Sequence, residues 1–147
     1  MPPDRGLFLP TTYRLRPELC AFTSDAYYEG RLGYADEAAR RSLAVGNGPV
    51  WHPVAHLGRG QSSVEEADAI AAAVRALVGT AFTDVDGSER PLTLGDVLVV
   101  APYNAQVRTL RSRLPEALAV GTVDKFQGQQ APVVIVSMAS SSAEDAP

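Results

Sequence analysis

Several features that would assign this chain to a class of protein are scarce in it. Cys20 is the only cysteine, which excludes an internal disulfide and fits a reducing, cytoplasmic location. Apolar runs such as the one from Val133 to Val136 are far too short to span a bilayer. The first residues, Met1 to Arg5, contain no apolar signal segment. We therefore expect neither secretion nor a membrane partner.

Size and composition are those of one ordinary globular domain. Of the 147 residues, 46% are hydrophobic and 20% charged, which is enough to bury a core. We expect one domain over residues 1–147, with a polar tail from 140 to 147. The net charge of −4 argues against a basic nucleic-acid surface. Nevertheless, Arg108, Arg111 and Arg113 lie close together in the sequence, so a local basic patch is compatible with the acidic total.

Apolar residues alternate between strand-like and helix-like patterns along the chain. The predicted strands are Val50–Leu57, Val97–Ala101, Leu118–Val123 and Val133–Met138, and the predicted helices begin at Pro17, after Ser63 and at Asn104. Residues 33–49 and 83–94 are expected to be loops. This order predicts an α/β fold with a mostly parallel sheet and helices on both of its faces.

The ends and faces of the predicted helices have recognisable signals. Leu19, Phe22, Ala26 and Tyr27 are expected to form the buried face of the first helix, and Gly30 its C-terminal cap. Ser63-Val64-Glu65-Glu66 has the pattern of a capping box, and apolar residues follow it at helical spacing.

The segment from Val120 to Gln130 carries the most specific signal. An apolar strand ends in Thr122, Asp124, Lys125 and amide side chains, and a second apolar strand follows. Parallel sheets present polar groups to a ligand in this way, at the carboxyl ends of their strands. Thr122 can donate to a phosphate, and Gly128 lets a ligand approach the main chain. The alternatives for Asp124 and Lys125 are a surface ion pair or a catalytic pair, although no nucleophile lies nearby in the sequence.

Two shorter motifs have both a functional and a structural interpretation. Tyr103 and Asn104 follow a predicted strand and open a helix, where backbone N–H groups favour phosphate and an aromatic ring can stack on a base. Alternatively, Asn104 only caps that helix. In Tyr13-Arg14-x-x-Pro17, the guanidinium of Arg14 suits a terminal phosphate, but a surface ion pair is the alternative.

The remaining residues with metal or redox chemistry are assigned structural roles. His52 and His56 lie four residues apart, but a zinc site would need further ligands and the chain offers one thiol. Cys20 fits a small core residue inside the first helix. No metal site is predicted.

Together, the segments Thr12–Pro17, Ala101–Gln106 and Val120–Gln130 resemble the second motor domain of a superfamily-1 helicase. This is a RecA-like domain of P-loop NTPase type, and the resemblance extends from about Gly6 to Pro147. It is strongest in the branch that contains the nonsense-mediated-decay and replication helicases. Within that branch it is closest to bacterial proteins whose helicase follows a RecB-like nuclease domain.

The resemblance implies a role for each motif. Arg14 would act on the terminal phosphate of ATP, and the residues bordering the nucleotide would be Arg14, Gln127, Gly128 and Gln130. The residues along single-stranded nucleic acid, with DNA favoured over RNA, would be Tyr103, Asn104, Gln106, Thr122 and Asp124. Relatives often carry glutamate at the position of Gln130, and an amide cannot supply that negative charge.

A complete nucleotide-driven motor needs two parts that the chain lacks. There is no Gly-x-x-x-x-Gly-Lys-[Ser/Thr] phosphate cradle and no acidic strand end for Mg²⁺. In the resembled family these parts lie in the first RecA-like domain, which would be the partner that binds most of the ATP and Mg²⁺. The resemblance also implies a fragment that ends before a final arginine motif and lacks the last helix and strand of the fold.

Two other functions are compatible with the same residues. The chain could be a non-enzymatic nucleic-acid-binding or partner module that uses a RecA-like fold. It could also be an unrelated doubly wound enzyme acting on a small ligand at its strand ends. ATP turnover would favour an enzyme, whereas strand binding without turnover would favour the module.

We predict that the 147-residue chain alone hydrolyses no ATP measurably. The absent lysine and Mg²⁺ carboxylate are the groups that neutralise developing charge in phosphoryl transfer. Phosphate release from purified protein is the measurement, with and without single-stranded DNA. Turnover that co-purifies with the polypeptide would contradict the prediction.

Overall fold

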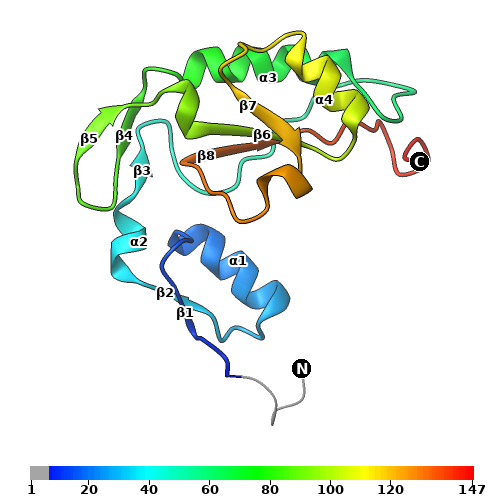
Figure 1. Ribbon diagram of the computed structural model, residues 1–147. Coiled ribbons are helices and arrows are strands. Elements are labelled where there is room, and N and C mark those ends of the chain that lie inside the picture. Colours follow the sequence, from blue (N-terminus) through cyan, green and yellow to red (C-terminus); the bar gives the residue numbers. More distant parts are fainter. Residues whose placement is uncertain (1–6) are drawn as a thin grey trace. The chain divides into compact units, whose positions relative to one another are not determined.

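The computed structural model describes residues 7–147 (Figure 1). Within this range the chain divides into two compact units. The first contains the described residues up to Trp51 together with Ala81–Arg90, and the second contains His52–Thr80 and Pro91–Pro147. The expectation of one domain over residues 1–147 stays a prediction, and each unit is described by itself.

The first unit consists of short elements. They are β1 (Thr11–Thr12), α1 (Pro17–Tyr27), β2 (Gly33–Tyr34), α2 (Asp36–Arg40), β3 (Ser42–Leu43), β4 (Ala81–Thr83) and β5 (Glu89–Pro91), whose last residue belongs to the second unit. Strands β1 and β2 are parallel, and β3, β4 and β5 form a second sheet in that order. Residues 33–49, expected to be a loop, therefore contain two strands and a helix.

Helix α1 begins at Pro17 as predicted, but its buried face differs from the prediction. Cys20 and Ser24 are buried, whereas Leu19, Phe22 and Tyr27 are exposed. The difference comes from a hydrogen bond in which the N–H of Leu32 donates to the Ser24 hydroxyl at 2.9 Å. The segment after the helix therefore packs on the face that carries Cys20 and Ser24.

Gly30, predicted to cap α1, lies two residues beyond the observed C-cap, Tyr28. The N–H of Gly30 donates to the Ser24 carbonyl at 3.0 Å, and Gly30 has a φ of 74°. Glu29 also adopts a positive φ of 56°. Two successive left-handed residues therefore reverse the chain after the helix.

Two predicted segments of the chain have a different structure. Val50–Leu57 forms no strand, and Trp51 and Leu57 in it are 78% and 92% exposed. The loop expected after Thr83 is instead part of a strand pair, β4 and β5, joined by a turn at Gly87. The turn signal was correct, but the short strands beside it have little apolar pattern.

The second unit is built on three parallel strands. The strands are β6 (Val97–Ala101), β7 (Ala119–Thr122) and β8 (Val133–Val136), in the order β7-β6-β8. The helices are α3 (Val64–Leu77) and α4 (Asn104–Arg111), with the 3-10 helices η1 (Leu94–Asp96) and η2 (Asp124–Phe126). This arrangement confirms the predicted α/β class with a mostly parallel sheet.

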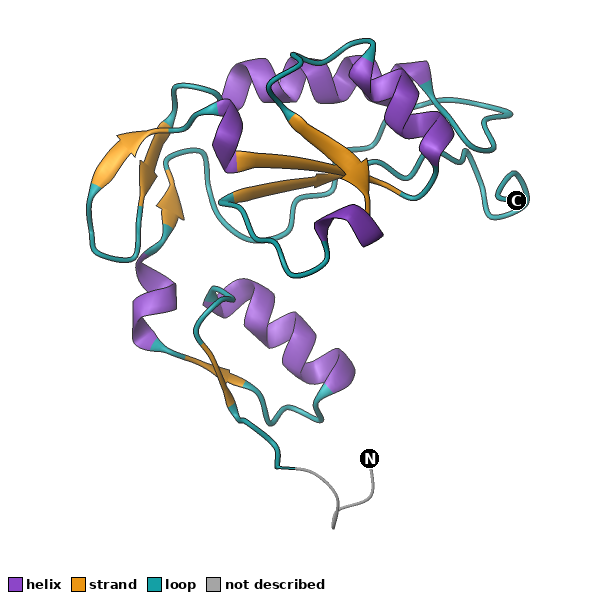
Figure 2. Cartoon of the chain, viewed as in Figure 1, coloured by secondary structure: helices purple, strands orange, loops and turns teal. Residues whose placement is uncertain are grey.

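Helices α3 and α4 lie on the same side of this sheet (Figure 2). Val97, Val99 and Ala101 of β6 are completely buried, as alternation along a strand requires for one face. Val107 and Leu110 of α4 are also buried, as the helical spacing predicts. Of the apolar stripe predicted for α3, Ala67, Ile70, Ala71 and Val74 are buried, whereas Leu77 at its end is only half-buried.

Strand β8 lies at an edge of the sheet. Among the described residues it pairs only with β6, although its all-apolar sequence is typical of a strand inside a parallel sheet. Val134 and Val136 are 52% and 61% exposed. No helix among residues 7–147 is long and apolar enough to cross a membrane.

Candidate functional site

The candidate site is the edge of the sheet at which all three parallel strands end. Ala101, at the end of β6, is the register partner of Thr122, at the end of β7. Pro102-Tyr103-Asn104 follows the first of these residues, and Val123 to Gln130 follows the second. Two motifs that are separate in the sequence therefore leave the sheet side by side, where parallel sheets bind ligands.

Tyr103 and Asn104 open helix α4. Tyr103 occupies the N-cap position and is half-buried, with no side-chain capping hydrogen bond. Asn104 is the first helical residue and is exposed, and within residues 7–147 its side chain makes no hydrogen bond. Asn104 is therefore not the cap of this helix, and its amide is available to a ligand.

Gln106 requires a correction. Its side chain is completely buried. Its amide accepts from the N–H of Ser63 at 2.7 Å and donates to the Ser63 carbonyl at 3.1 Å and to the Ser137 hydroxyl at 2.9 Å. A side chain with no exposed surface cannot touch a nucleic-acid strand. In this structure Gln106 joins the start of α4 to the start of α3 and the end of β8.

The N-terminus of α3 has half of the predicted capping box. The Ser63 hydroxyl accepts from the N–H of Glu66 at 3.0 Å, as predicted. The Glu66 side chain does not return to the N–H of Ser63, which Gln106 satisfies instead. The sequence signal therefore located the helix start but not the partner of the Glu66 carboxylate.

The Glu66 carboxylate lies at the centre of a buried hydrogen-bond network. It accepts from Nε2 of His56 at 2.9 Å and from the Ser137 hydroxyl at 2.5 Å. It also accepts from the N–H of Ala139, at 3.1 and 3.2 Å to its two oxygens. Burial raises the pKa of Glu66, but the hydrogen bonds from Ser137, Ala139 and His56 outweigh burial and hold the pKa below its ordinary value of 4.5.

His56 extends the network to the segment after β8. Its Nδ1 lies 2.7 Å from the Ser141 hydroxyl, which accepts from the N–H of Arg59 at 2.9 Å. Every group is satisfied when Ser141 donates to Nδ1 and Nε2–H donates to Glu66, which corresponds to a neutral ring. His56 is thus structural, as predicted, while His52 is exposed. Within residues 7–147 no group of three or more His, Cys, Asp or Glu could hold a metal ion.

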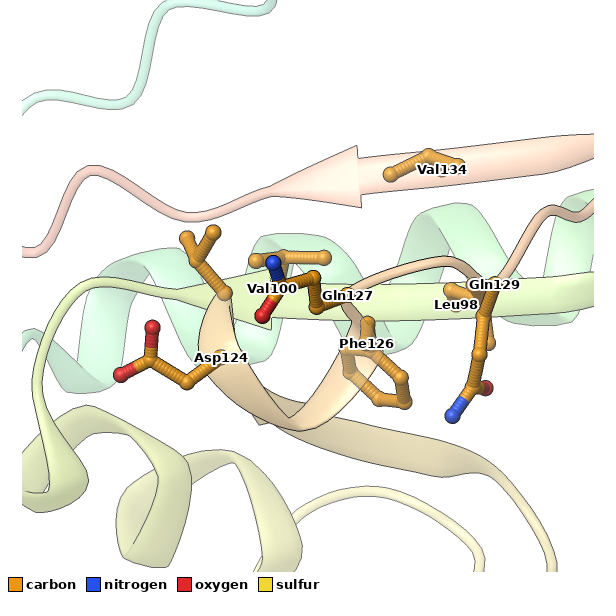
Figure 3. Close-up of a pocket in the computed structure, with 8 residues that line it drawn as sticks. Leu98, Val100, Asp124, Phe126, Gln127, Gln129 and Val134 are labelled. Carbon is orange, nitrogen blue, oxygen red and sulfur yellow. The ribbon is translucent and has the colours of Figure 1, made fainter.

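The segment after β7 borders a hollow of about 430 Å³ on the sheet face away from α4 (Figure 3). Its walls are Leu98, Val100, Val123, Asp124, Phe126, Gln127, Gln129 and Val134. Two of the predicted residues, Asp124 and Gln127, therefore line the same hollow. Gly128 and Gln130 are exposed farther along the segment, and Gly128 has a φ of 83°, which favours glycine.

Arg14 belongs to the first unit, whereas the other predicted site residues belong to the second. It follows β1 and is exposed, and its N–H donates to the Thr12 hydroxyl at 3.2 Å. No carboxylate of residues 7–147 forms an ion pair with its guanidinium. Arg16, by contrast, is paired with Glu18 at 3.2 Å and donates to the Ala39 carbonyl at 2.8 Å. The surface-ion-pair alternative thus describes Arg16 and not Arg14.

Comparison with known proteins assigns this chain to a family. Residues 3–146 match the AAA domain family, and the chain belongs to it. The chain is 27% identical over 91% of its length to the DNA polymerase alpha-associated DNA helicase A of Schizosaccharomyces pombe. It is 25% identical over 88% of its length to an Arabidopsis thaliana protein named "Probable helicase MAGATAMA 3". The matches span 23% and 18% of these relatives. The α/β fold is consistent with a RecA-like domain of this family.

We predict that Glu66→Gln lowers the free energy of unfolding at neutral pH by about 1–3 kcal/mol, because an amide cannot accept from all the buried donors. The pKa of Glu66 is lower in the folded chain, so the stabilisation is complete above pH 4.5 and is lost as the pH falls below that value. Urea unfolding at several pH values is the measurement.

Glu37→Gln is the matched control, since Glu37 is exposed on α2 and the substitution removes the same charge. The difference between wild type and Glu66→Gln should shrink below pH 4.5, whereas Glu37→Gln should differ little from wild type throughout. Equal stability of all three chains at pH 7 would show that the network contributes nothing.

Proposed function

We propose that this chain supplies the second motor domain of an ATP-dependent superfamily-1 helicase, in the branch that includes bacterial proteins with a RecB-like nuclease. In this role it forms one wall of the ATP cleft and part of the track for single-stranded nucleic acid. The first RecA-like domain of the same motor forms the other wall. Membership of the AAA domain family and similarity to helicases support this proposal.

The adjacency of the two motifs at the carboxyl edge of the sheet carries the proposal. The register of Ala101 with Thr122 brings a helix start and a hydroxyl-bearing strand end together. In this proposal Tyr103 stacks on a base, and the free amide of Asn104 and the hydroxyl of Thr122 bind phosphate or sugar. Asp124 is an acceptor only, which suits a base or sugar hydroxyl rather than a phosphate.

The nucleotide side of the proposal rests on Arg14 and on the segment after β7. A guanidinium without an ion-pair partner among residues 7–147 suits the terminal phosphate of ATP. Gln127, Gly128 and Gln130 offer amide and main-chain groups to the sugar and phosphates. Because these residues include no carboxylate, Mg²⁺ would be held by the first motor domain.

A non-enzymatic strand-binding module is the second candidate. The observation that favours it is the adjacency of Ala101 and Thr122, because the motifs that leave the sheet there can bind a strand whether or not ATP is hydrolysed. Both candidates use the same surface for the strand, and DNA is favoured over RNA. They differ in whether Arg14 affects ATP turnover.

Strand binding by the chain itself tests the shared part of both candidates. We expect single-stranded oligonucleotides to bind weakly and with little base preference, and the affinity to fall steeply with salt, because phosphate contacts dominate. Tyr103→Ala combined with Thr122→Val should weaken binding of every sequence alike. Fluorescence anisotropy with labelled oligothymidylate and mixed-sequence strands is the measurement.

The control combines Tyr27→Ala with Thr80→Val. Tyr27 is 75% exposed in the first unit, and Thr80 follows the far end of α3, a helix about 21 Å long. Similar losses in both double variants would mean that the site is elsewhere. Strong selection of one base sequence would contradict a phosphate-based track.

The nucleotide side requires a longer chain that also contains the phosphate cradle. In such a motor, Arg14→Ala should lower ATP turnover by about 10³–10⁵-fold, the range seen when an arginine that stabilises the transferred phosphate is removed. Strand binding should change little. Arg16→Ala is the comparison, since Arg16 already pairs with Glu18. Near-normal turnover of the Arg14 variant would exclude the ATP role.

A further inference from the structure

Two cationic side chains converge on one backbone atom at the edge of β7. The carbonyl oxygen of Val120 accepts from Nη2 of Arg111 at 3.3 Å and from Nζ of Lys125 at 3.1 Å. Arg111 is the last residue of α4, and Lys125 lies in η2. Strand β7 pairs only with β6 among the described residues, so no strand of that part of the chain covers its other edge.

The two cations approach this edge from different sides of the strand. The side chain of Lys125 lies across Gly121, where an added Cβ would meet Cδ of Lys125 at 2.5 Å. The side chain of Val120, the preceding residue, points to the opposite face of the sheet, and Val120 is only 2% exposed. Helix α4, which carries Arg111, packs against β7. The glycine therefore leaves room for one cation, while the helix positions the other.

Neither cation has an acidic partner among residues 7–147, whereas other surface arginines do. Arg59 pairs with Glu65 at 2.6 Å, and Arg113 pairs with Asp68 at 3.3 Å. Two positive groups that share one neutral acceptor repel each other, and an anion placed beside them is attracted by both. The pair is therefore a locally positive feature in a chain whose net charge is −4.

The chemistry of the pair fits a phosphate. A guanidinium binds two oxygens of a phosphate side by side, and an ammonium adds a compact charge. Thr122 lies two residues farther along β7, about 6.6 Å from Val120 at the usual rise of a parallel strand. An extended phosphodiester chain that reaches Thr122 can thus continue along the strand edge to these cations.

We propose that Arg111 and Lys125 form a phosphate-binding site at the free edge of β7, which extends the single-strand track beyond Thr122. This inference rests on the proposed function, because it takes the occupant to be the backbone of a bound nucleic-acid strand. Free inorganic phosphates have the same chemistry, and the experiment distinguishes them from a nucleic-acid strand as the occupant of the site.

The test combines Arg111→Gln with Lys125→Gln in the 147-residue chain. The matched control is Arg40→Gln with Arg75→Gln, which removes the same charge from exposed arginines that have no ion pair among residues 7–147. Binding of an oligothymidylate of about 20 nucleotides is followed by anisotropy between about 50 and 200 mM salt. Unfolding midpoints in urea verify that each variant is folded.

We expect the Arg111 and Lys125 variant to bind the strand about 2- to 30-fold more weakly, as for the removal of two exposed charged groups. Its plot of log affinity against log salt should be shallower by about 0.7 for each phosphate that the variant no longer neutralises. The control should bind nearly as tightly as wild type and keep the wild-type slope. An equal weakening in both variants, or an unchanged slope, would overturn the inference and leave the proposed function standing.

A second arm measures binding of inorganic pyrophosphate by calorimetry to wild type and to the same variants. If the wild-type chain binds no strand, the proposed function fails. Pyrophosphate binding that disappears in the Arg111 and Lys125 variant would then assign the site to free phosphates and overturn the nucleic-acid occupant. Binding of neither ligand would overturn the site itself.

Discussion

The candidate site depends on the hydrogen bonds that the buried carboxylate of Glu66 accepts. This carboxylate accepts hydrogen bonds from His56, Ser137 and the N–H of Ala139, and so joins the first turn of α3 to the segments before that helix and after β8. A buried carboxylate is costly unless its oxygens are satisfied. Here the donors come from segments far apart in the sequence, and the need to satisfy the charge holds those segments together.

The same network constrains the backbone beside it. Ala139 is completely buried and has a φ of 67°, a left-handed conformation that costs energy in a residue with a Cβ. The N–H of Ala139 donates to both carboxylate oxygens of Glu66, and this offsets the cost of the left-handed conformation. Gln106 then connects Ser137 to the start of α4. The half-buried Tyr103 and the exposed Asn104 therefore lie at the start of a helix whose first turn is held in place by buried hydrogen bonds.

The polar residues of the second unit consequently fall into two groups. Gln106, Ser63 and Ser137 use their hydrogen-bonding groups within the protein, whereas Asn104 remains exposed at the strand ends. The basic residues divide in the same way. Arg59 is paired with Glu65, whereas Arg111 and Lys125 have no acidic partner among residues 7–147. Local pairing, rather than the net charge, therefore decides where the surface of this acidic chain is locally positive.

The sequence alone determined the three parallel strands of the second unit, the helices α3 and α4 and the positions of the motifs, but it also predicted a strand at Val50–Leu57 that does not form. Strands such as Val97–Ala101 and helices such as Asn104–Arg111 have a periodicity that depends on local geometry, and the Ser63 cap is a local hydrogen bond. Only the tertiary structure decided that Gln106 is internal, that α1 buries Cys20 and Ser24, and that Arg111 and Lys125 meet at Val120. These outcomes depend on which distant group comes within hydrogen-bonding distance. The residue pattern of a segment specifies its polar and apolar side chains, but not the neighbours that the folded chain places beside them.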